Sequence, residues 1–177
     1  KTWHTCTSPF TVTTELTRHT VLARSWDNSG NVEEPPVSVS FRIDKTPPTL
    51  TLTAVPAEIN GVKPNHMVGV NYSGTVEESG SGLYATPHTM LVDEYGELDQ
   101  DLGTCPSGVV AVEAWCSGND RDGRTYTIRL SACDVAGNET TVAATVTVPH
   151  KRDAEKTNNG RSKQEVPVAA DGNRKER

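Results

Sequence analysis

The stretches HTVLARSWDNSGN (residues 19–31) and YTIRLSACDVAGN (residues 126–138) align without a gap at an offset of 107 residues. Both end in the pattern D-x-x-G-N, and the residues before it alternate between apolar and polar side chains. Such alternation is typical of a β-strand with one buried face. We therefore predict an internal repeat in which each copy ends in a β-hairpin. The aligned positions of the pattern are Asp27 with Asp134, Gly30 with Gly137, and Asn31 with Asn138.

The D-x-x-G-N pattern has two interpretations. As a turn, its aspartate accepts hydrogen bonds from nearby backbone N–H groups, and its glycine supplies a positive φ. As a calcium loop it would supply a single carboxylate, whereas calcium takes about six to eight oxygen ligands. The ligand count favours a structural turn in both copies.

Alternating segments continue on either side of the second hairpin. Residues 142–148 follow its turn with the same period of two, and residues 37–43 do so in the first copy. Further strands are predicted at residues 49–54, 67–76, 85–94 and 108–115, separated by glycine, proline and acidic clusters. About six or seven short strands within about 100 residues indicate an all-β fold, an antiparallel β-sandwich.

The repeat divides the chain into three segments. Residues 1–44 match the C-terminal part of a module, and residues 45–149 form a complete one. The stretch DKTPPT (44–49) marks the boundary, because prolines cannot donate to a sheet and stiffen an extended connection. Residues 150–177 have little apolar content and are expected to be a disordered linker. The start of the chain lacks the apolar core of a signal peptide, and we expect a fragment of a longer polypeptide.

Charge and motifs exclude several classes of function. Residues 46–149 hold 4 basic and 13 acidic side chains, which argues against nucleic-acid binding, since phosphate contacts need Lys and Arg. No run of about 18 apolar residues is present to span a membrane. No known catalytic motif occurs, so we expect no enzyme activity.

The cysteines suggest the cellular compartment. The sequence has four, at positions 6, 105, 116 and 133, and they match no zinc spacing. Cys105 and Cys116 bracket a short segment, and we predict a local disulfide between them. A disulfide would fit an oxidising, extracellular location.

The repeated D-x-x-G-N turn, the junction RIDKTPPTLTL (42–52) and the Ser-Gly turn SGSGL (79–83) together resemble bacterial immunoglobulin-like repeats of large secreted and surface proteins. The resemblance covers residues 18–149, and it departs from the repeats at the acidic loop 93–101 and the cysteine-bearing segment 105–116. It implies an immunoglobulin-like sandwich without catalytic activity that serves as a spacer, stalk or adhesive module in the extracellular space. Its partners would be neighbouring modules of the same chain and a cell-surface glycan or protein.

An alternative function is a carbohydrate- or ligand-binding accessory module of a secreted hydrolase. Trp3, Trp26 and Trp115 could stack on sugars, although tryptophan is also an ordinary packing residue and no aromatic strip appears at one spacing.

Calcium is the one cofactor for which the sequence gives candidates. In an immunoglobulin-like sandwich the loops after the second and sixth strands lie where the chain enters. That placement would bring Glu77, Glu78 and Asp134 near Asp44, where a calcium ion would relieve the repulsion between carboxylates. Solvated carboxylates without a metal are the alternative. A second candidate, the loop DEYGELDQDLG (93–103), lacks the glycine and glutamate spacing of a calcium-binding EF-hand.

Overall fold

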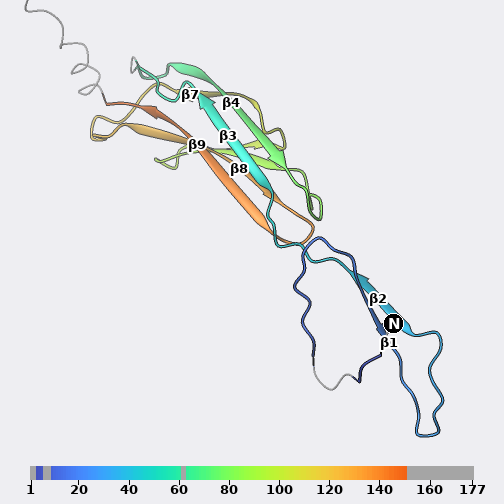
Figure 1. Ribbon diagram of the computed structural model, residues 1–177. Coiled ribbons are helices and arrows are strands. Elements are labelled where there is room, and N and C mark those ends of the chain that lie inside the picture. The colour runs from blue at the N-terminus through green and yellow to red at the C-terminus, as the bar shows by residue number, and fades with distance from the viewer. Residues whose placement is uncertain (1–2, 6–8, 61–62, 151–177) are drawn as a thin grey trace, which may run out of the picture.

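The protein folds entirely from β-strands in the parts of the chain that the computed structural model describes, residues 3–5, 9–60 and 63–150. In those residues no helix is of the length and apolarity needed to cross a membrane. Within these described ranges nine strands form three antiparallel sheets (Figure 1). Their bounds are β1 His19–Ala23, β2 Val37–Phe41, β3 Thr49–Val55, β4 Met67–Glu77, β5 His88–Asp93, β6 Asp99–Gly103, β7 Gly108–Glu113, β8 Arg124–Cys133 and β9 Glu139–Val148.

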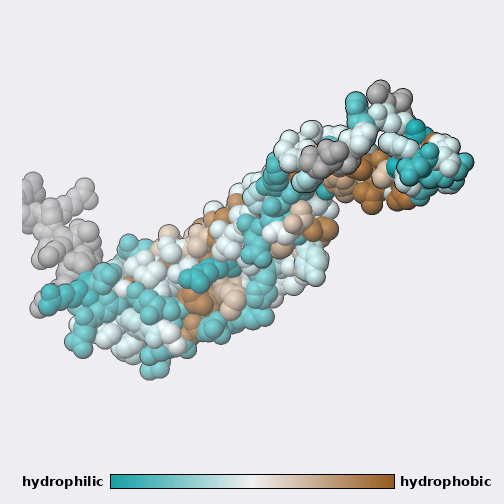
Figure 2. All heavy atoms as spheres, turned by 90° about the horizontal axis from the view of Figure 1, so that it is seen from below, coloured by the Kyte–Doolittle hydropathy of each residue, from teal (hydrophilic) through white to brown (hydrophobic). Residues whose placement is uncertain are grey.

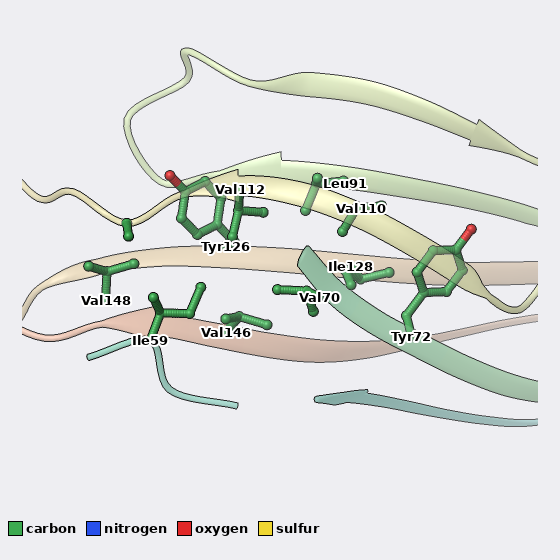
Figure 3. Packing of buried hydrophobic residues seen from close by; sticks show 11 residues of the cluster. Ile59, Val70, Tyr72, Leu91, Val110, Val112, Tyr126, Ile128, Val146 and Val148 are labelled. Carbon is green, nitrogen blue, oxygen red and sulfur yellow. The ribbon is translucent and has the colours of Figure 1, made fainter. Parts of the chain in front are cut away.

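Strands β3 to β9 build the sandwich that the sequence predicts. One sheet has the order β3-β4-β7 and the other has the order β6-β5-β8-β9. Their facing sides enclose one main apolar cluster, which takes Val70 and Val110 from the first sheet and Leu91, Ile128 and Val146 from the second (Figure 3). Burial of these side chains is the main force that holds the two sheets together.

The alternation read from the sequence determines which side chains are buried. In β8 every second residue from Arg124 to Ala132 is buried. The strand predictions hold apart from end residues, with one exception. Strand β6, which pairs with the edge of β5, lies inside a segment that we predicted to be an acidic loop. Its first three residues, Asp99, Gln100 and Asp101, are exposed, as polar residues on an edge strand can be.

Strands β1 and β2 form a separate hairpin that extends from one end of the sandwich (Figure 1). If the ungapped alignment of the two copies is continued beyond the turn, it places Val37 with Ala144 and Val39 with Val146. The strand pairing shows that this register is wrong. His19 pairs with Phe41, whereas Tyr126, its counterpart in β8, pairs with Val146. The first hairpin therefore holds two extra residues between its turn and β2. A shift of two residues keeps each side chain on its original face, because side chains alternate with a period of two.

The C-terminal tail predicted to be disordered lies outside the described residues from position 151 onward, as does Cys6.

Candidate functional site

The two D-x-x-G-N turns share the hydrogen bonds between their aspartate and asparagine, whereas only Asp27 also accepts from the residue two positions on, Ser29. In the second turn Asp134 Oδ1 accepts from the backbone N–H of Asn138 at 2.8 Å, and Asp134 Oδ2 accepts from the Asn138 side-chain amide at 2.8 Å. In the first turn Asn31 makes the equivalent bonds to Asp27 at 2.9 and 2.6 Å. The glycines have φ values of 87° and 90°. Each residue of the pattern thus has the turn-forming task expected from the sequence.

The surroundings of the two turns differ. Asp134 is buried, with 1% of its surface exposed, whereas Asp27 is exposed. The second turn lies against the loop that follows β4. The backbone N–H of Val135 donates to the carbonyl of Gly82 at 2.8 Å, and that of Ala136 donates to Ser81 Oγ at 3.2 Å.

The segment that leaves the hairpin is bound to this same end of the sandwich. The carboxylate of Asp44 accepts from the backbone N–H of Ser81 at 2.6 Å and from that of Thr46 at 3.1 Å. The Asn138 side chain donates to the carbonyl of Asp44 at 3.3 Å. We call this arrangement of Asp44, residues 78–82 and residues 134–138 the joint. Because β2 ends only three residues before Asp44, the joint fixes the base of the hairpin.

Two further features tighten the joint. Gly80 lies so close to the Asp44 carboxylate that a methyl group at this position would overlap its oxygens. Beyond Asp44, Thr140 Oγ donates to the carbonyl of Pro48, which is buried, at 2.7 Å. The Ser-Gly turn noted in the sequence is therefore a binding surface for the connecting segment.

Three of the four carboxylates of the predicted calcium site come together in the joint. Oxygens of Asp44, Glu78 and Asp134 lie within 4.8 Å of one another, and Glu77 is exposed and outside this group. Each of the three already accepts a backbone N–H, from Ser81 and Thr46, from Gly80 and from Asn138 respectively. The N–H group of Thr46, followed by the bond from Ser81, lowers the pKa of Asp44 below its ordinary value. These donors offset part of the negative charge, and the carboxylates are also the hard oxygen ligands that calcium prefers.

In the second calcium candidate, the loop 93–103, carboxylates pair with two different basic side chains, Arg124 and His88. Asp93 is buried and forms an ion pair with Arg124, to which Glu97 also pairs at 3.0 Å. Asp101 instead pairs with His88 at 2.9 Å. Asp93 and Glu97 therefore contribute to the structure of the sandwich end opposite the joint. The pair of Asp101 with His88 lies nearer the joint, because His88 is opposite Ser131 of β8.

Arg124 is the residue that our reading of the sequence missed. Its side chain is 4% exposed, pairs with Asp93, Glu97 and Glu113, and lies over the Tyr126 ring at 5.0 Å from the centroid. A buried cation is stable only with such partners. The signal was present, because Arg124 occupies the inward-facing parity of β8 together with Tyr126 and Ile128.

The predicted disulfide is wrong in this structure, because Cys105, Cys116 and Cys133 are all free thiols. Cys105 precedes β7 and is exposed, whereas Cys116 follows β7 and is buried. An extended strand of six residues spans about 20 Å, far more than a disulfide bridges. The segment between the two cysteines is therefore a strand and not a short loop.

Among the contacts of the described residues, none brings two of the three tryptophans together into one sugar-stacking surface. Trp3 stacks on the Arg24 guanidinium at 4.1 Å, and Trp115 is half-buried. Trp26, which is 58% exposed, pairs across the first turn with Val32.

Comparison of the chain with protein-family models, curated proteins and solved structures found no match.

Proposed function

We propose that the chain is a non-catalytic spacer from an extracellular bacterial protein. It would consist of the end of one immunoglobulin-like module, residues 1–44, followed by a complete module, residues 45–149. The joint carries this proposal, because hydrogen bonds from two loops of the sandwich bind the segment connecting the two parts. A spacer needs such a connection, since a bare linker would leave the modules free to reorient.

The strand order supports the immunoglobulin-like assignment. Seven strands occupy two antiparallel sheets, and one sheet holds the first, second and fifth strands in that order. Constant-type immunoglobulin domains have the same three strands together in one sheet, and their fourth strand belongs to that sheet as well. Here the fourth strand, β6, lies beside β5 in the opposite sheet. The repeated turn and the Pro-Pro junction support the assignment to bacterial tandem repeats and hence an extracellular location.

The adhesive and carbohydrate-binding alternatives have less support. Sugar-binding surfaces commonly present rings to the ligand, and Trp26 is the one tryptophan of the three with most of its surface exposed. The joint, in contrast, involves three separate segments of the chain. The spacer function therefore accounts for more of the described contacts.

Nuclear magnetic resonance relaxation tests the spacer function directly. Backbone amides of β1–β2 and of β8–β9 are expected to report the same overall tumbling time in the native chain. In the Gly80→Ala variant the added methyl displaces Asp44, and the hairpin amides should then tumble faster than those of the sandwich. Gly118→Ala is the matched control, because a methyl there meets nothing within 4 Å. Independent tumbling of the hairpin in the native chain would overturn the proposal.

A further inference from the structure

One face of the first hairpin is apolar and open. Val37, Val39 and Phe41 on β2 are 61%, 59% and 36% exposed. Figure 2 shows apolar surface gathered at the end of the molecule that carries this hairpin. Such residues in a row on one strand mark a surface that another element normally covers.

The second hairpin shows what covers the equivalent face. Three of the five pairs between β1 and β2 lie on this face. They are His19 with Phe41, Val21 with Val39 and Ala23 with Val37, and they correspond to Tyr126 with Val146, Ile128 with Ala144 and Leu130 with Val142. In the sandwich, Tyr126, Ile128, Leu130 and Val146 are all at most 1% exposed. They pack against residues of β3, β4 and β7.

The two faces differ in sequence in a compensating way. Tyr126 of β8 corresponds to the smaller His19 in β1, and Ile128 corresponds to Val21. Leu130 corresponds to Ala23, and there the partner remains a valine. On the partner strand the change is opposite, because Ala144 is replaced by Val39 and Val146 by Phe41. A core tolerates such exchanges when its total volume is kept. Paired losses and gains are therefore expected of a face that packs against a sheet, and a solvated face has no reason for them.

The edge of the hairpin is open as well. In the sandwich β8 pairs with β5 on one side and with β9 on the other. In the described part of the chain β1 pairs with β2 alone. The stretch TCTSP (5–9) resembles TCPSG (104–108), whose last residue begins β7. Residues 9–14 therefore correspond to β7, yet they form no strand, and Phe10 is 62% exposed. This segment is thus in the sequence position of β7 without a partner equivalent to β4.

We propose that the open face of β1–β2 binds a segment of the same polypeptide that lies ahead of Lys1 and provides four strands equivalent to β3–β6. The strand equivalent to β5 would pair with the free edge of β1. The strand equivalent to β4 would pair with residues 9–14, so that the three-stranded sheet covers Val37, Val39 and Phe41. This inference rests on the proposed function and specifies the interface that completes the first module.

Hydrogen exchange compares the present chain with a polypeptide extended by about 60 residues of the natural sequence ahead of Lys1, enough for four strands and their turns. We expect β1–β2 amides to exchange at least about 100-fold more slowly in the extended protein. Residues 9–14 should gain protection as well. Amides of β8 and β9 serve as the internal reference and should not change.

Substitutions on the two faces of β2 test whether its apolar face is the one that binds the added segment. Phe41→Asp in the extended protein should return β1–β2 exchange to the rate of the present chain, and Ser38→Asp on the opposite face of β2 should leave it slow. Unchanged exchange after extension, or a gene that encodes no such strands, would overturn the inference. So would a dimer of the present chain whose contact already protects β2. None of these results alters the tumbling measured at the joint, so the two proposals fail separately.

Discussion

The carboxylate of Asp44 accepts a hydrogen bond of 2.6 Å from the backbone N–H of Ser81, a residue 37 positions further along the chain. Asp44 belongs to the connecting segment and Ser81 to the loop after β4. Together with the bonds from Asn138 and Thr140, this bond attaches the connecting segment to the sandwich. Because Gly80 leaves no space between them, the contact depends on the absence of a side chain at that position.

The two D-x-x-G-N turns predict unequal effects of one substitution. Asp134→Ala removes a buried acceptor and takes away the partner of the Asn138 backbone N–H, which should lower the free energy of unfolding of the sandwich by about 1–3 kcal/mol. Asp27→Ala breaks equivalent bonds at an exposed site outside the sandwich and should leave that transition unchanged. Urea unfolding followed by tyrosine and tryptophan fluorescence measures both. Equal losses would contradict the different burial of the two turns.

The ion pairs of Arg124 predict a large loss of stability. Arg124→Met leaves the Asp93 carboxylate buried without its cation and should cost about 3–5 kcal/mol in the free energy of unfolding. Arg129→Met, on the exposed face of the same strand, should stay within about 0.5 kcal/mol of the native protein. The double variant Asp93→Asn with Arg124→Met removes both charges and should recover part of the loss. Chemical denaturation of the four proteins provides the comparison.

The same ion pair determines how stability depends on pH. Burial by itself raises the pKa of Asp93, but the backbone N–H of Leu98 and the Arg124 guanidinium outweigh burial and hold that pKa below its ordinary value. A carboxylate whose pKa is lower in the folded state stabilises the fold above its unfolded pKa of about 3.9. That contribution is lost as the pH falls through the folded pKa. Unfolding free energies should therefore be flat near neutral pH and fall below about pH 4.

The prediction is tested by comparing the pH at which the native protein and the Arg124→Met variant lose stability in acid. Arg124→Met removes the group that favours the ionised form of Asp93. As the pH is lowered, the variant should therefore begin to lose stability at a higher pH than the native protein. Identical acid unfolding curves for the two proteins, once aligned for overall stability, would show that other carboxylates govern the transition.

Calcium binding in the joint predicts a stabilisation that depends on one glutamate. At a free calcium concentration about 100 times Kd, a single site that exists only in the folded state adds about 2.7 kcal/mol. Thermal unfolding with calcium and with a chelator measures this difference. Glu78→Gln should abolish it, whereas Glu77→Gln should retain it, because Glu77 lies outside the cluster. A melting temperature unaffected by calcium would show that the N–H donors alone compensate the three carboxylates.

The free cysteines predict ordered reactivity towards a thiol reagent. Cys105 is exposed and should react before Cys116 in the native protein. Burial, followed by the nearby Asp120, raises the pKa of the Cys116 thiol, so Cys116 should react slowly until the protein unfolds. Mass spectrometry after timed labelling separates the two. A disulfide between them in the oxidised protein would restore the prediction made from the sequence.

The sequence was sufficient where local pattern determines structure. Alternation identified strands such as β8 and β9, and the repeated pattern identified both hairpin turns. The sequence was misleading where two incompatible predictions were made for the same segment. The Cys105–Cys116 bridge was predicted together with a strand at 108–115, although an extended strand holds its two ends apart. Strand β6 was missed because an exposed edge strand can be as polar as a loop.

The joint could be predicted only in part. Asp44, Glu78 and Asp134 were expected to lie close together, and the structure brings them together. Glu77 was assigned to the same group, but neighbouring residues of an extended strand face opposite ways. Glu77, the last residue of β4, is exposed, whereas Glu78, the next residue, is half-buried. The role of Gly80 depends on the approach of a segment distant in sequence. No pattern within the chain encodes that distance.

The chain enters the sandwich through β3 at the joint and leaves it through β9 at the opposite end (Figure 1). Near that end Glu58 and Thr147 form a parallel bridge. A force that pulls the two ends apart is therefore directed along the strands. Under such a load the hydrogen bonds between β3 and β4, and between β8 and β9, are sheared together instead of being opened one at a time. Resistance to stretching then depends on whole strand pairs, and the Thr140–Pro48 bond lies where the load first reaches the sandwich.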